Sequence, residues 1–174
     1  EGKTLGIVGL GGIGGRVAVL ANAFGMKVIC WTRRPSRERS EKYGVEFCDL
    51  SELFSSSDIV SLHLALNEMT VCLIGKDLLS RMKDGALLVN TARAELVDER
   101  ALKAELETNR IKGAFDVFHR EPLRKSDTLR KYQNVIMTPH TGYNTPEANY
   151  SICELATKAV VSYFRGKPMN VVNS

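Results

Sequence analysis

The chain has 174 residues, of which 44% are hydrophobic and 25% are charged, and its net charge is +4. This length and composition are typical of one ordinary globular domain. The small basic excess forms no basic stripe with interleaved aromatic residues, which weighs against nucleic acid as a partner. An apolar run of about 18 residues is missing, so no membrane span is predicted. Four scattered cysteines favour reduced thiols in a cytoplasmic protein.

Short apolar runs alternate with helical patterns along the whole chain. Runs such as 86–89 are continuously apolar, as expected for strands covered on both faces. Strands are predicted at 4–8, 27–32, 45–47, 59–64, 86–90, 111–118 and 135–138. Helices are predicted at 16–24, 49–56, 76–82, 98–108 and 145–165. This order predicts a single α/β domain over 1–174. It is a doubly wound, mostly parallel Rossmann sheet with helices on both faces, and ligands bind at the carboxyl ends of its strands.

The first predicted strand runs directly into a glycine-rich turn and then a helix. In this G-x-G-x-x-G turn, Gly9 permits a tight turn, Gly11 lets the backbone approach a pyrophosphate, and Gly14 lets helix and strand pack closely. The N-terminus of the helix offers free N–H groups and a positive dipole to phosphate. The next predicted strand follows at the expected distance. The sequence therefore predicts a dinucleotide site that also includes Gly12 and Ile13.

The end of the second predicted strand bears on the choice of cofactor. NAD sites usually carry an acidic residue there that binds the ribose 2′-hydroxyl. This chain has Thr32, Arg33 and Arg34 instead. Two arginines would pair with a 2′-phosphate through charge-assisted hydrogen bonds. We therefore favour NADP over NAD, with a solvated basic loop as the alternative interpretation.

Three polar segments, at 90–98, 113–122 and 134–142, follow later predicted strands. Arg93 could hold a carboxylate and polarise a carbonyl group. His140 could deliver a proton, and Glu121 could hydrogen-bond to it and raise its pKa. Each of the three could be an ordinary surface residue, but the coincidence of all three favours a site. Together they predict an oxidoreductase that transfers a hydride to or from a 2-keto or 2-hydroxy acid.

In this order, the motifs resemble those of the D-isomer-specific 2-hydroxyacid dehydrogenases, which include phosphoglycerate dehydrogenase, glyoxylate/hydroxypyruvate reductase and D-lactate dehydrogenase. The matching segments are 9–14, 61–64, 90–93, 116–118, 121–122 and 138–140. The resemblance implies that Arg93, Glu121 and His140 are catalytic. It also implies that Gly12-Ile13 meets the pyrophosphate and that Asp116 bonds the nicotinamide carboxamide. The residues implied to line the remaining cofactor surface are Leu64, Thr91, Ala92, Arg93, His140 and, in the loop after it, Gly142.

Several positions depart from the family pattern. Ala94 replaces a common glycine, and Ala65 replaces a common proline. The methyl group of Ala94 would crowd the backbone beside Arg93 if this position needs a positive φ. Thr32 stands where many NAD-using members carry aspartate, which supports NADP. Full-length members also carry a substrate domain that nothing here supplies. We therefore expect a cofactor-binding fragment of a two-domain parent, poorly active alone and homodimeric through this domain.

Other interpretations remain open. The family resemblance extends to dinucleotide-sensing corepressors, so a scaffold is an alternative to an enzyme. A Rossmann methyltransferase or other nucleotide binder is disfavoured by the segments 121–122 and 138–140. We expect His63 to be a core or cleft-edge residue and His119 to be exposed. No metal-ligand spacing is recognised, so no metal is predicted.

Overall fold

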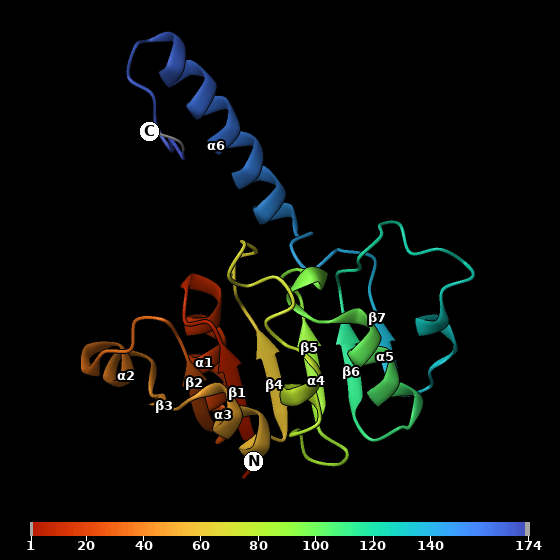
Figure 1. Cartoon of the computed structure of the whole chain (residues 1–174). Helices are drawn as coiled ribbons and strands as arrows, with labels where there is room; N and C mark the ends of the chain where they lie inside the picture. The colour runs from red at the N-terminus through yellow and green to blue at the C-terminus, as the bar shows by residue number, and fades with distance from the viewer. Residues whose placement is uncertain (1, 173–174) are drawn as a thin grey trace. The chain divides into compact units, whose positions relative to one another are not determined.

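The computed structural model describes residues 2–172 and contains a seven-stranded parallel sheet (Figure 1). The strand order is β3-β2-β1-β4-β5-β6-β7. The chain runs outward from β1 to β3 and then crosses back to β4, so the point of reversal in the sheet lies between the neighbours β1 and β4. The strands are β1 (Thr4–Val8), β2 (Lys27–Trp31), β3 (Glu46–Phe47), β4 (Ile59–Leu62), β5 (Leu87–Asn90), β6 (Lys112–Phe115) and β7 (Val135–Met137). The predicted α/β class and parallel sheet are confirmed. In such sheets ligands bind at the carboxyl ends of the strands beside the point of reversal.

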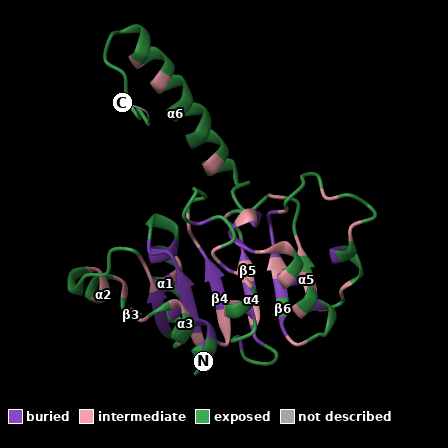
Figure 2. Cartoon of the chain, in the orientation of Figure 1, coloured by how far each residue is buried: buried purple, intermediate pink, exposed green. Residues whose placement is uncertain are grey.

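Two hydrophobic clusters cover the two faces of the sheet. On β1, Leu5 and Ile7 belong to one cluster, whereas Val8 belongs to the other. Successive side chains of a strand point to opposite faces, so this division follows from the strand period. Figure 2 shows that buried residues gather on the central strands β1 and β4, whereas the edge strands β3 and β7 have no buried residue. Both faces are apolar, which explains why the strands read as continuous apolar runs.

The helices are α1 (Gly12–Ala23), α2 (Arg37–Tyr43), α3 (Leu50–Ser56), α4 (Lys76–Leu79), α5 (Glu99–Glu107) and α6 (Pro146–Phe164). Three of the predicted starts carry side-chain caps. Asp49 accepts from the N–H of Glu52 at 2.8 Å, and Asp98 accepts from that of Ala101 at 2.7 Å. Thr145 caps α6 in the same way. These bonds satisfy N–H groups that have no partner within the helix.

Two differences from the sequence expectations affect the site. No helix is predicted between the second and third strands, yet α2 lies there, capped by Ser36 and ended by Gly44 at φ 62°. The sixth strand is predicted to end at 118, but β6 ends at Phe115. Val117 is buried although it lies outside the strand, so its apolar character reflects loop packing.

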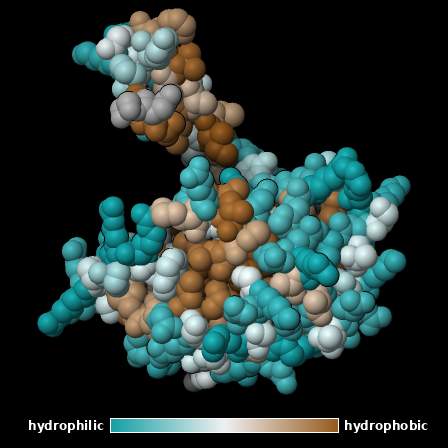
Figure 3. All heavy atoms as spheres, viewed as in Figure 1, coloured by the Kyte–Doolittle hydropathy of each residue, from teal (hydrophilic) through white to brown (hydrophobic). Residues whose placement is uncertain are grey.

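The chain divides into two compact units, one up to Pro139 and one from His140. The second unit contains α6, a helix of 19 residues, all of them described and none buried. Its exposed apolar side chains include Tyr150, Leu155 and Phe164. Figure 3 shows apolar residues along this helix. Among residues 2–172, no helix has the length and apolar character needed to span a membrane.

Candidate cofactor-binding and catalytic site

The glycine turn has the close contacts that its sequence predicts. Gly9 has φ +102°, a conformation that L side chains rarely adopt. A Cβ atom on Gly14 would lie 2.1 Å from the carbonyl oxygen of Gly9, inside van der Waals contact. These two positions therefore require glycine for the turn and for the packing of α1 on β1.

Gly11 and Gly12 lie in open space at the N-terminus of α1. A Cβ atom on either glycine would meet nothing within 4 Å. Gly11 is the N-cap, and within residues 2–172 no side chain caps this helix end. The first N–H groups of α1 are thus accessible and lie at the positive end of its dipole. This arrangement fits a phosphate group, as predicted for a dinucleotide.

Arg39 of α2 connects the end of β2 to the glycine turn. Its Nη1 donates to the Arg34 carbonyl at 2.6 Å and to Thr32 Oγ1 at 3.5 Å, and its Nη2 donates to the Leu10 carbonyl. Arg33 and Arg34 themselves are exposed. Arg39 is a half-buried residue that sequence reasoning missed. The flanking cap residues Ser36 and Gly44 are the signal that could have revealed its helix.

A hollow of about 450 Å³ lies beside the glycine turn, at the carboxyl ends of β4 and β5. It contains residues from three segments far apart in the sequence. Its lining residues are Ile13, His63, Leu64, Ala65, Leu66, Thr91, Ala92 and Arg93. The structure therefore brings together Ile13, Leu64, Thr91, Ala92 and Arg93, all predicted site residues.

The side chain of Asn90 forms hydrogen bonds within the turn that carries Arg93. The Asn90 side chain donates to the Arg93 carbonyl at 2.8 Å and accepts from the Ala92 N–H at 3.0 Å. Arg93 is exposed, and its Nη1 donates to the Ala92 carbonyl at 2.6 Å. Ala94 is not among the described residues with positive φ, so its methyl group does not cause the backbone crowding considered in the sequence analysis. The sequence analysis did not include Asn90 among the site residues.

His63 lies at the wall of the hollow, as expected for a cleft-edge histidine. Its Nε2 is 2.9 Å from Ser61 Oγ. Burial lowers the pKa of His63 because it disfavours the charged imidazolium. Burial and the hydrogen bond to Ser61 therefore mark His63 as a structural residue of the wall. His119 is exposed, as predicted.

Two predicted acidic site residues follow β6. Asp116 is 4% exposed, and its Oδ1 accepts from Thr138 Oγ1 at 2.5 Å. Glu121 is exposed, and its Oε1 accepts from the Phe118 N–H at 3.0 Å. Because β6 pairs with β5, the residues after both strands lie at the same border of the sheet.

His140 and Gly142 belong to the second unit. His140 has φ 54° and is half-buried, and its ring meets that of Tyr143 edge-on with centroids 6.4 Å apart. Gly142 is exposed. The pairing of His140 with Glu121 stays a prediction. In the described part of the chain, no group of three or more His, Cys, Asp or Glu residues is placed to hold a metal ion.

The sheet order, the glycine turn and the hollow at the strand ends define a Rossmann-type dinucleotide-binding domain. Residues 1–142 match the family described as D-isomer specific 2-hydroxyacid dehydrogenase, NAD binding domain. The chain belongs to this family and corresponds to its cofactor-binding domain.

Similarity to individual proteins supports the same assignment. The chain is 40% identical over 174 residues to a glyoxylate reductase of Korarchaeum cryptofilum, with 99% of this chain and 52% of the relative covered. An acyclic imino acid reductase in complex with NADPH and D-Arg is 36% identical, with a TM-score of 0.87 over 99% of this chain and 54% of that one. D-lactate dehydrogenase from Aquifex aeolicus, complexed with NAD and lactic acid, is 34% identical, with a TM-score of 0.86 over 95% and 54%. The chain spans about half the length of the curated relative.

Proposed function

We propose that this chain is the cofactor-binding domain of an NAD(P)-dependent oxidoreductase. The enzyme would transfer a hydride between nicotinamide and a short 2-hydroxy or 2-keto acid. The observation that carries the proposal is the hollow that joins Ile13, beside the open glycine turn, to Arg93 at the end of β5. One relative is a glyoxylate reductase, and one solved structure holds NAD and lactic acid.

Several groups of the first unit would hold the cofactor. The N–H groups near Gly11 and Gly12 suit the pyrophosphate, because nothing covers the space beside these glycines among the described residues. The backbones of Leu64 and Thr91-Ala92 would line the neighbouring stretch. Asp116 would accept from the carboxamide while Thr138 fixes its carboxylate. When bound, the nicotinamide supplies or accepts the hydride.

Arg93, Glu121 and His140 would perform the remaining chemistry. The guanidinium of Arg93 would bind the substrate carboxylate in bidentate fashion and polarise the adjacent carbonyl group. In the reductive direction, protonated His140 would donate its proton to the developing alkoxide, and in the oxidative direction the neutral imidazole would accept the hydroxyl proton. Glu121 would favour the charged imidazolium and so raise the pKa of His140.

We further propose that NADP is preferred over NAD. Thr32, Arg33 and Arg34 supply no carboxylate that would repel a 2′-phosphate, and the exposed guanidinium groups of both arginines would pair with one. One solved structure similar to this chain holds NADPH.

The free thiols of all four cysteines fit a reducing compartment such as the cytoplasm. We also propose that the chain forms a homodimer, and sedimentation velocity tests this oligomeric state.

Fluorescence titration of the chain with NADPH and NADH tests cofactor preference. We expect tighter NADPH binding, and we expect Arg33→Gln/Arg34→Gln to weaken NADPH by about tenfold while leaving NADH nearly unchanged. Arg81→Gln/Arg100→Gln makes the same charge change at exposed positions elsewhere and should alter neither affinity. Tighter NADH binding by the unsubstituted chain would contradict the preference.

Turnover should be measured in the longest natural chain that contains this sequence. We expect oxidation of the reduced cofactor with glyoxylate, hydroxypyruvate or phosphohydroxypyruvate, and its loss in His140→Asn with cofactor binding retained. Cofactor binding without turnover of any keto acid would instead favour the dinucleotide-sensing scaffold.

A further inference from the structure

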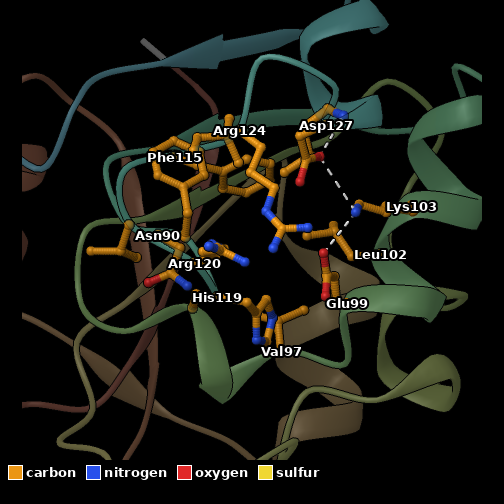
Figure 4. A pocket seen from close by; sticks show the side chains of 15 residues that line it. Asn90, Val97, Glu99, Leu102, Lys103, Phe115, His119, Arg120, Arg124 and Asp127 are labelled. Carbon is orange, nitrogen blue, oxygen red and sulfur yellow. Dashed lines mark hydrogen bonds and ion pairs between the residues drawn. The ribbon is translucent and has the colours of Figure 1, made fainter.

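A second pocket, here called the loop pocket, lies between α5, the end of β6 and the segment 118–129 (Figure 4). Its volume is about 250 Å³, slightly below the range of about 300–1,000 Å³ typical of small-molecule sites. Of the described residues, neither Arg93 nor Glu121 lines it. The proposed cofactor and catalytic groups therefore leave this pocket unexplained.

The inner surface of the loop pocket is apolar. Val97, Leu102 and Phe115 are all buried and contribute aliphatic and aromatic surface. Leu102 belongs to α5 and Phe115 to β6, whereas Val97 directly precedes Asp98, the N-cap of α5. Leu129, also buried, adds to this surface from the short 3₁₀ turn Thr128–Lys131. An apolar surface of this kind favours a ligand with a hydrocarbon body.

The mouth of the pocket carries positive charge. Arg120 and Arg124 are exposed, and Figure 4 shows their guanidinium groups turned into the pocket. Figure 4 draws no hydrogen bond or ion pair from either guanidinium to the other lining residues shown. Lys103 already pairs with both acidic lining residues, Glu99 at 2.6 Å and Asp127 at 3.4 Å. The two arginines therefore remain available to an anion.

We propose that the loop pocket binds a small monocarboxylate with an apolar body. Its carboxylate would lie between Arg120 and Arg124, because guanidinium groups bind carboxylates in bidentate geometry. Its body would pack on Val97, Leu102 and Phe115, which a bare inorganic anion cannot do. The limited volume excludes large acids.

Such a ligand would also act on the segment that carries Glu121. Arg120 directly precedes Glu121, and the Glu121 carboxylate accepts from the N–H of Phe118, another lining residue. A ligand bound in the loop pocket would therefore restrict the motion of the segment that contains Phe118, Arg120 and Glu121. Any effect on turnover rests on the proposed function, whereas binding to the pocket does not.

Calorimetric titration of the 174-residue chain with phenylacetate tests the proposal. We expect saturable binding, with phenylacetamide and inorganic phosphate each weaker by about tenfold or more, because one lacks the charge and the other the apolar body. Methyl-resolved NMR should show shifts at Val97, Leu102 and Leu129. Absence of saturable binding, or shifts confined to Ile13 and Leu64 at the cofactor hollow, would overturn the proposal.

The double variant Arg120→Gln/Arg124→Gln should bind phenylacetate about tenfold more weakly while keeping its circular dichroism spectrum. The control Arg81→Gln/Arg100→Gln removes the same charge outside the pocket and should bind normally. Equal affinity in the two double variants would refute the role of the arginines. NADPH titration of the same samples separates this result from a failure of the proposed cofactor site.

Discussion

The side-chain amide of Asn90 donates to the main-chain carbonyl of Arg93 at 2.8 Å. Asn90 is the last residue of β5 and only 3% exposed, so a buried side chain determines the shape of the turn. The position of the Arg93 guanidinium thus depends on a residue that has no charge of its own.

Substitution of Asn90 tests this dependence. Asn90→Ala removes the bonds to both Arg93 and Ala92, and we expect it to lower the free energy of unfolding by about 1–3 kcal/mol. It takes away the side-chain partner of the Ala92 N–H and leaves the Arg93 carbonyl with the 3.3 Å bond from the Leu96 N–H. Urea unfolding measures the change. The exposed control Gln133→Ala should stay within about 0.5 kcal/mol of the unsubstituted chain. An equally small effect of Asn90→Ala would show that the turn holds without this amide.

Substitution by alanine should lower the stability of the chain at Gly14 but not at Gly12. Gly14→Ala places a methyl group against the Gly9 carbonyl, and we expect a loss of about 1–3 kcal/mol in the free energy of unfolding. Gly12→Ala meets no atom and lies at the first residue of α1, so stability should be unchanged or rise by up to about 1 kcal/mol. Its methyl group would occupy the proposed phosphate space, so NADPH affinity should fall. Thermal unfolding and cofactor titration measure the two effects, and unchanged NADPH affinity in Gly12→Ala would contradict the phosphate site.

Arg39 and Arg37 form a matched pair on α2. Arg37 pairs with Glu41 in an exposed i,i+4 contact, whereas Arg39 bonds the glycine turn and the end of β2. We expect Arg39→Gln to cost about 1–2 kcal/mol of stability and to weaken both NADH and NADPH, because the turn loses its brace. Arg37→Gln should change stability by less than about 0.5 kcal/mol. Indistinguishable unfolding curves for these two variants would count against the bracing role.

The pH dependence of stability should report on His63. Burial holds its folded-state pKa below the ordinary value of 6.5, so the unfolded chain binds a proton first as the pH falls. Stability therefore decreases as the pH falls through 6.5 towards the lowered pKa, and the loss is complete below that pKa.

We expect His63→Gln to reduce the difference in Tm between about pH 7.5 and about pH 5.5, because one buried proton-binding group is removed. Scanning calorimetry at both pH values measures this difference. His119→Gln removes an exposed imidazole and should keep the original pH dependence. If His63→Gln keeps it as well, the acid sensitivity arises from other groups.

The sheet could be predicted from the sequence because its strands are short apolar runs separated by capped helices. The predicted strand starts agree with the structure to within one residue, since local apolar character begins where burial begins. The end of β6 was overestimated because Val117 is apolar for loop packing and not for sheet pairing.

The features that were missed depend on contacts between distant segments. Helix α2 has no buried residue, so its sequence lacks the apolar periodicity that identifies a helix. The role of Arg39 depends on Leu10, which is 29 residues away along the chain. The loop pocket likewise forms only where α5 meets the segment after β6. Residue types at the strand ends indicated the site. The hydrogen bonds by which Arg39 and Asn90 stabilise its turns could be identified only from the structure.

The position of β1 has a consequence for how this chain can be shortened. Leu5 pairs with Val28 of β2 on one side and with Ile59 of β4 on the other, so the first strand in sequence is an interior strand of the sheet. Trimming the amino terminus past β1 would remove the hydrogen-bond partners of both β2 and β4, which pair with it through five and four residues. Unpaired strand edges readily recruit strands from other molecules, so the trimmed protein would aggregate and would not simply lose a small piece.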